Sequence, residues 1–158
     1  MKLSQPLRLL LLFVFICAGT QLFAQQVNGV LPDKSAKAGT WTEWQSVKDS
    51  SGAEIAQYRI RMASSKKFVG ETRECHFEVE VVNKISHTLT VDLDYSFTQT
   101  IAGNTQSDSK HLGGIITKKG KSWTFEMLLF NDATGNDKTG ACFGCDLSYT
   151  LTFGVSKY

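Results

Sequence analysis

Hydrophobic and polar side chains alternate with a period of two over most of the chain that follows Thr40. Such alternation is typical of a β-strand with one buried and one solvated face, whereas an amphipathic helix repeats every 3.6 residues. The odd-numbered residues are the apolar ones wherever the alternation is clearest, which is in the ranges 75–82, 89–97, 123–128 and 145–155. We therefore predict a strand in each range, with its odd-numbered side chains buried.

Shorter runs with the same period predict further strands around Trp41, around Ile60 and over 112–116. Around Ile60, Tyr58 and Met62 should share the buried side, and the intervening Arg59 and Arg61 should point outward. Clusters of Gly, Asn, Asp, Ser and Lys separate the runs and predict turns at 49–52, 103–109, 118–121 and 131–140. With no helical period anywhere in this part of the chain, the pattern predicts an all-β, antiparallel sandwich of about seven strands.

The first 24 residues have the pattern of a secretory signal peptide. Lys2 and Arg8 flank the start of an apolar stretch, Leu9–Ala18, and a small residue, Ala24, precedes the expected cleavage point. The alternative, a membrane anchor, needs about 20 apolar residues to span a bilayer, and this stretch is shorter. We expect an exported protein that resides in the periplasm, on the outer surface or outside the cell.

Removal of the signal peptide changes the charge balance of the chain. Two of the 17 Lys and Arg precede the expected cleavage point, so 15 remain against 15 Asp and Glu. A nucleic-acid partner is therefore not expected, because such binding needs an excess of clustered positive charge. No later segment is apolar enough for an integral membrane segment. We expect a flexible leader over 25–39 and a single domain over 40–158.

Two segments, 77–97 (FEVEVVNKISHTLTVDLDYSF) and 115–130 (IITKKGKSWTFEMLLF), resemble bacterial immunoglobulin-like domains. In those domains a strand ends in Asn before a short polar turn, and a Gly-Lys/Glu-Ser turn opens a later strand. The resemblance covers roughly half of the mature chain and implies an immunoglobulin-like β-sandwich. A jelly roll is the competing architecture.

The pair Cys142 and Cys145 in CFGC has three possible roles. A redox centre of the thioredoxin type needs its first cysteine at a helix N-terminus, but CFGC precedes a predicted strand. A zinc site needs four ligands, and Cys75 and His76, as neighbours on one strand, face opposite ways. In an exported chain a structural disulfide is the favoured reading.

The immunoglobulin-like resemblance implies which cysteines pair. If 76–82 and 146–153 are the second and sixth strands of such a sandwich, they begin at the same end of the domain in opposite sheets. Cys75 and Cys145 then both point between the sheets, so we predict a Cys75–Cys145 disulfide. The rival is a local Cys142–Cys145 bridge.

Other candidate residues have a functional and a structural interpretation. Four carboxylates could line one acidic surface that attracts a cation or a basic partner, although a solvated face with Arg59 and Arg61 as counter-charges is favoured; they are Glu78, Glu80, Asp92 and Asp94. Trp41 and Trp44 could stack on a sugar, but on a regular strand they would face opposite sides and form no common platform.

Three oxygen ligands of the kind calcium prefers occur in the 131–140 turn, but their spacing matches no EF-hand loop: Asp132, Asn136 and Asp137. A flexible loop is the favoured interpretation of this segment.

Catalytic motifs are missing: the chain has neither G-x-S-x-G nor H-E-x-x-H. We therefore expect no enzyme, no cofactor and no metal. The leading hypothesis is an exported, non-catalytic binding or structural protein that recognises an unknown protein or glycan ligand through its longest connections, 99–110 and 131–144. The alternatives are a small carbohydrate-binding or carbohydrate-active module and a structural subunit that self-associates through its edge strands.

Overall fold

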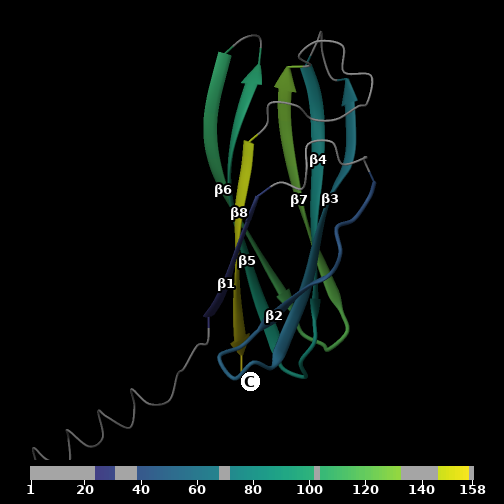
Figure 1. Cartoon of the computed structure of the whole chain (residues 1–158), viewed down its shortest axis with the longest axis vertical. Coiled ribbons are helices and arrows are strands. Elements are labelled where there is room, and N and C mark those ends of the chain that lie inside the picture. The colour runs from purple at the N-terminus through teal and green to yellow at the C-terminus, as the bar shows by residue number, and fades with distance from the viewer. Residues whose placement is uncertain (1–23, 31–38, 68–71, 102–103, 133–145, 157–158) are drawn as a thin grey trace, which may run out of the picture.

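Within residues 24–30, 39–67, 72–101, 104–132 and 146–156, which the computed structural model describes, the chain forms eight β-strands and no helix (Figure 1). The strands are β1 (Ala24–Val30), β2 (Gln45–Lys48), β3 (Glu54–Lys67), β4 (Thr72–Asn83), β5 (Thr88–Ile101), β6 (Asn104–Ile116), β7 (Ser122–Asp132) and β8 (Asp146–Ser156). The all-β prediction is confirmed, with eight strands in place of about seven.

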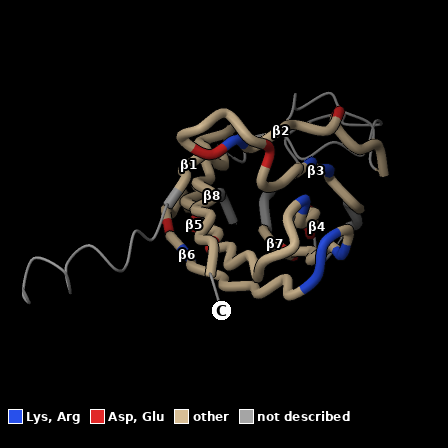
Figure 2. Tube along the Cα trace, turned by 90° about the horizontal axis from the view of Figure 1, so that it is seen from below, with Lys and Arg blue, Asp and Glu red and all other residues tan. Residues whose placement is uncertain are grey.

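The strands form two antiparallel four-stranded sheets, one with the order β1-β8-β5-β6 and the other with the order β2-β3-β4-β7. Viewed along the strands, the sheets lie as two facing layers (Figure 2). The chain passes from one sheet to the other four times, between β1 and β2, between β4 and β5, between β6 and β7 and between β7 and β8. The architecture is therefore a β-sandwich in which the faces that point away from the partner sheet remain open to solvent.

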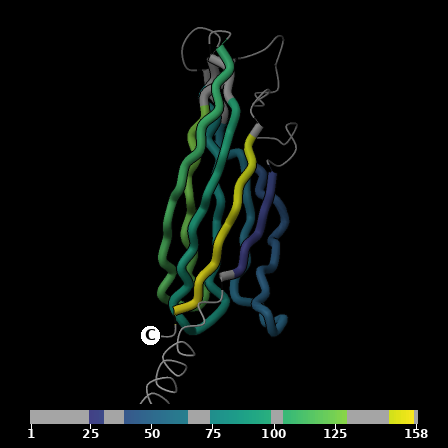
Figure 3. Tube along the Cα trace, turned by 90° about the vertical axis from the view of Figure 1, so that its left-hand side faces the viewer, coloured from purple at the N-terminus to yellow at the C-terminus, as the bar shows by residue number. Residues whose placement is uncertain are grey.

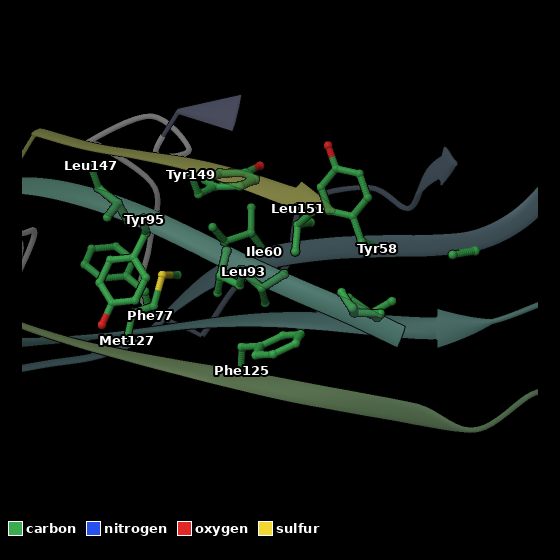
Figure 4. Close-up of a cluster of buried hydrophobic side chains, with 14 of the residues drawn as sticks. Tyr58, Ile60, Phe77, Leu93, Tyr95, Phe125, Met127, Leu147, Tyr149 and Leu151 are labelled. Carbon is green, nitrogen blue, oxygen red and sulfur yellow. The ribbon is translucent and has the colours of Figure 1, made fainter. Parts of the chain in front are cut away.

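The core fills the space between the two sheets, and alternation explains which side chains enter it (Figure 4). The odd-numbered apolar residues of β4, β5 and β8 are buried as predicted, and the even-numbered side chains of β3, including Tyr58, Ile60 and Met62, join them. The change of parity follows from pairing, because Ile60 lies directly opposite Val79. Two inward faces with a period of two thus make one continuous apolar layer.

Asn83 is the one buried polar residue among the described residues, and its side chain ties the end of β4 to two other segments. Its Nδ2 donates to the carbonyl oxygens of His87 and Ile116, each at 2.9 Å, and its Oδ1 accepts from the backbone N–H of Ile85 at 2.8 Å. The amide thereby satisfies its hydrogen bonds inside the core and fixes the turn that leads to β5.

The expected flexible leader over 25–39 is wrong for its first residues, because Ala24–Val30 forms β1. This strand pairs along its whole length with β8, and Val27 lies opposite Leu151 (Figure 3). The segment has little apolar alternation because it is an edge strand: its stabilisation comes from backbone hydrogen bonds to β8 together with the partly buried Val27. The hydrophobic pattern of the sequence therefore does not predict such a strand.

β6 is longer than predicted, since the sequence indicated a strand only over 112–116. Its first eight residues are all exposed, so they show no buried-face pattern. Their backbones nevertheless pair with β5 up to Ile101 opposite Asn104. The stretch 103–109, predicted as a turn from its Asn, Ser and Asp content, is therefore mostly strand, and the predicted 99–110 connection is a hairpin.

Trp123 also differs from the prediction, because 45% of it is exposed although its neighbours at odd positions on β7 are buried. Its ring lies against the backbone of β6: a Cβ built on Gly114 would be 3.0 Å from Trp123 Cδ1. The ring therefore lies next to that of Phe125 at the side of the sandwich where the edge strands β6 and β7 approach each other, and there it remains partly exposed.

The expected signal peptide lies outside the described residues except for Ala24, which begins β1. Among the residues that are described, no helix has the length and apolar character needed to cross a bilayer.

Candidate binding groove

A groove of about 870 Å³ runs across the solvent-facing side of the β1-β8-β5-β6 sheet. All four strands contribute to it, so its floor is a regular sheet and not a cluster of loops. It is shallow and open, because most of the outward-facing side chains that line it are exposed. The candidate site therefore lies on the face of a regular sheet, and the backbone hydrogen bonds between the strands fix its shape.

One row of polar side chains crosses the groove at a single register. Asn28, Thr150, Asp94 and His111 lie opposite one another on β1, β8, β5 and β6. Thr150 Oγ1 donates to Asn28 Oδ1 at 2.8 Å, and His111 Nδ1 lies 2.8 Å from Asp94 Oδ1. Side chains that occupy one register on adjacent antiparallel strands are direct neighbours, which is why four residues far apart in sequence form one row.

A second row lies next to the first and consists mainly of hydroxyl groups. Ser148, Ser96 and Ser109 follow one another on β8, β5 and β6. The hydroxyl oxygens of Ser96 and Ser148 are 2.8 Å apart and hydrogen-bonded. Each hydroxyl can both donate and accept, so the two rows offer a dense set of donors and acceptors to a ligand.

His111 is a titratable residue of the groove, and its imidazole exists in a neutral and a cationic form. Its Nδ1 faces Asp94 and its Nε2 lies 3.8 Å from Asp92, so each ring nitrogen is directed at a carboxylate. The hydrogen bond with Asp94 is the largest cause that raises the pKa of His111 above its ordinary value, and the negative charges of Asp94 and Asp92 act in the same direction. The imidazole is thus held ready as a charge-assisted hydrogen-bond donor.

Beneath the groove, β1 and β8 approach closely because residue 29 is glycine. A Cβ at Gly29 would lie 2.2 Å from Cζ of the Tyr149 ring, so the ring occupies the space that any larger residue would need. Burial is the largest cause that raises the pKa of Tyr149, and it raises that of Tyr58 on the opposite sheet as well. The two tyrosines lie near each other in the core (Figure 4). The Tyr58 hydroxyl donates to Gln45 Oε1 at 2.6 Å.

The carboxylates that could have formed one acidic surface are divided between the two sheets. Asp92 and Asp94 lie on the groove side of β5, whereas Glu78 and Glu80 lie on the outer face of β4 in the other sheet. The hypothesis of a common acidic surface is therefore wrong. The strands that carry the two pairs are consecutive in sequence, but they belong to opposite layers.

Arg59 and Arg61 are the counter-charges of Glu80 and Glu78, as the favoured interpretation predicted. Both Nε and Nη2 of Arg59 donate to Glu80 Oε2, at 2.8 and 2.6 Å. Arg61 makes the same pair of contacts with Glu78 Oε2, at 2.8 and 2.7 Å. These pairs are direct cross-strand neighbours between β3 and β4.

Trp41 and Trp44 lie on the same side of the chain, which corrects the expectation that they face opposite ways. Their segment is not a regular strand before Gln45. Every third residue of this segment lies opposite every second residue of β3. The contacts are Gly39 N–Met62 O at 2.7 Å, Thr42 N–Ile60 O at 2.9 Å and the Gln45–Tyr58 pair.

A spacing of three on this segment therefore matches a spacing of two on β3, and the tryptophans meet the arginines. The guanidinium of Arg59 lies 4.5 Å from the ring centroid of Trp41 and 4.3 Å from that of Trp44. Arg61 lies 4.2 Å from the Trp41 centroid. The guanidinium groups thus lie over the indole rings as a cation–π ladder, and Trp44 remains 39% exposed.

Cys75 lies in the core on β4, fully buried, while its neighbour His76 faces outward on the same strand. The prediction that these two side chains point to opposite faces is confirmed. Cys142 and Cys145 lie outside the described residues, and so do Asn136, Asp137 and the side chain of Asp132 from the expected calcium-ligand set. The 131–144 connection is likewise outside them apart from the end of β7.

No family model and no curated protein matches the chain. Among solved structures, it is similar to the Salmonella enterica trimeric lipoprotein SadB, at 11% sequence identity over 94% of this chain and 70% of that one, with a TM-score of 0.33. A likeness this distant carries no argument about fold or function.

Proposed function

We propose that the protein is an exported, non-catalytic β-sandwich that binds a hydroxyl-rich ligand, with a glycan as the best-fitting class, in the groove of the β1-β8-β5-β6 sheet. The observation that carries this proposal is the pair of polar rows along the groove floor, formed by residues of four strands. Export rests on the signal-like sequence of residues 1–24. The ligand-binding surface is here assigned to a sheet face in place of the loops.

The chemistry of the groove suits a ligand that is rich in hydroxyl groups. Asp94 supplies an acceptor, His111 a charge-assisted donor, and the serines and threonine groups that do both. The hydroxyl groups of a glycan, which both donate and accept, can replace the water that these exposed groups bind. The aromatic rings of Tyr95 and Tyr149 are directed into the core, so recognition rests on hydrogen bonds and not on stacking.

The immunoglobulin-like assignment belongs to the same proposal. It is supported by the two facing antiparallel sheets and by the placement of β4 and β8 in opposite layers. The chain has eight strands in the described residues where the hydrophobic pattern predicted about seven, and the strands predicted as second and sixth are the fourth and eighth.

A glycan array probed with the purified, fluorescently labelled protein tests the function. A groove variant, Thr150→Ala, and a matched variant on the outer face of the other sheet, Thr124→Ala, remove the same hydroxyl from solvent-facing positions. We expect glycan binding that weakens several-fold in Thr150→Ala and is unchanged in Thr124→Ala. Ser96→Ala and Ser122→Ala provide a second such pair. Equal binding by all four variants, or binding of no glycan at all, would reject the proposal.

A further inference from the structure

We propose that His76, Glu78 and Glu126 form a binding site for a divalent transition-metal ion on the outer face of the β2-β3-β4-β7 sheet. Their ligand atoms, one imidazole nitrogen and two carboxylate oxygens, all lie within 4.8 Å of one another. The site is separate from the groove, which lies on the other sheet, and it involves no cysteine. It therefore stands or fails independently of the proposed glycan binding.

Strand geometry explains why these three side chains converge. His76 and Glu78 are two residues apart on β4, so they project from the same face of the sheet. Glu126 on β7 lies directly opposite Glu78, and His76, which lies opposite Leu128, is its diagonal neighbour. His76 Nε2 and Glu126 Oε2 are already 3.6 Å apart. A cation between them needs only small side-chain rotations to be bound by all three groups.

One of the three ligands is held in place by its neighbours. Arg61 donates from Nε and Nη2 to Glu78 Oε2, and the guanidinium of Arg61 lies over the Trp41 ring. A carboxylate has two oxygens with about four lone-pair sites, so Glu78 can accept from Arg61 and still bind a metal. Hydrogen bonds that orient a ligand in this way are a regular feature of metal sites.

The ligand set also favours a class of ion. An imidazole with two carboxylates suits Zn²⁺, Ni²⁺ or Cu²⁺, whereas Ca²⁺ and Mg²⁺ prefer sites made of oxygen ligands alone. Three protein ligands leave at least one coordination position of a tetrahedral ion open. Because 70% of the Glu126 side chain is exposed, water or a group of a partner molecule can reach that position.

The test is isothermal titration of the untagged, purified chain with Zn²⁺ near pH 7.5, in a buffer that does not bind metal. We expect one ion per chain, and we expect His76→Ala and Glu126→Gln each to weaken binding by at least about tenfold. His87→Ala is the matched control, because His87 is an exposed histidine of the turn after β4 and lies in no such cluster. It should bind Zn²⁺ as the parent does.

Three results would overturn the proposal. The first is the absence of Zn²⁺ binding at millimolar concentration. The second is binding that survives in His76→Ala but is lost in His111→Ala, which would place the ion beside Asp92 and Asp94. The third is binding that survives in His76→Ala but disappears after alkylation of the cysteines, which would place the ion at CFGC. Circular dichroism of each variant verifies that the sandwich is folded.

Discussion

His111 and Asp94 lie directly opposite each other on β6 and β5, and their side chains meet at 2.8 Å on the floor of the groove. They are 17 positions apart in sequence, and the β5–β6 hairpin brings them together. This contact joins the edge strand to a central strand of the sheet and raises the pKa of the His111 imidazole.

The first prediction concerns that imidazole. Asp94→Asn should lower the pKa of His111 toward its ordinary value, because the hydrogen bond with Asp94 is the largest cause of the rise. The measurement is an NMR titration of the His111 ring in the parent and in the variant. A His111 pKa that is the same in the variant and the parent would contradict the assignment.

The same pair predicts the direction of a pH effect on stability. The pKa of His111 is raised in the folded state, so its stabilising contribution is fully present below the unfolded value of about 6.5 and is lost as the pH rises through the folded value. Urea denaturation at several pH values should show this loss in the parent and a smaller one in Asp94→Asn. A loss of equal size in both proteins would assign the effect to other groups.

The second prediction concerns the close approach of β1 to β8. Gly29→Ala should destabilise the fold by about 1–3 kcal/mol, because the added methyl would overlap the Tyr149 ring, which is itself packed in the core. Gly113→Ala is the control, since the nearest atom to its added Cβ is a side-chain oxygen of Asp92 at 3.3 Å. Chemical denaturation should give a much smaller loss for Gly113→Ala. Equal losses would show that β1 is not held against Tyr149.

The third prediction concerns the ladder of Trp44, Arg59 and Trp41. Arg59→Lys keeps the charge near Glu80 but loses the planar group between the two rings, so it should cost about 1 kcal/mol of stability. Glu80→Gln keeps the stack and removes the ion pair. Tryptophan fluorescence should change in Arg59→Lys and stay close to that of the parent in Glu80→Gln. A lysine variant with parental stability and emission would show that stacking contributes nothing.

The fourth prediction is the disulfide between Cys75 and Cys145. Cys75 is buried at the start of the apolar face of β4, and it takes part in an interaction. Asp146, the residue after Cys145, begins β8 in the opposite sheet. The bridge would close a loop of about 70 residues, which corresponds to about 4 kcal/mol in the chain-entropy description. Peptide mapping without reduction should recover Cys75 linked to the peptide that contains CFGC. Recovery of alkylated Cys75 beside a Cys142–Cys145 bridge would contradict it.

Strands with a buried face could be predicted from the sequence, because burial imposes a period of two on residues such as Phe77, Val79, Leu93 and Leu151. Strand segments without a buried face could not be predicted. β1 and the first part of β6 are held by backbone pairing at sheet edges, where the side chains remain exposed and follow no apolar pattern.

The candidate site was missed for a related reason. Its residues are the even-numbered polar side chains of β1, β5 and β8 together with odd-numbered ones of β6, and only the register between strands places them in one row. A signal was present in the run of Ser, Thr and Asp at even positions of 90–98 and 148–152. The tryptophan ladder also depends on strand pairing. The tryptophans are three residues apart (W-x-x-W) and the arginines two apart (R-x-R), and these spacings match only because the two segments are neighbours.

The most direct test of the central claim is to locate the bound ligand by NMR. Amide chemical shifts of the isotope-labelled protein would be followed during titration with the strongest glycan from the array. We predict that the largest changes fall on the groove residues of β1, β5, β6 and β8, with Asn28, Asp94, Ser96 and Thr150 among them. Changes confined to the 131–144 connection, or to the outer face of the β2-β3-β4-β7 sheet, would contradict the claim that this groove is the binding site.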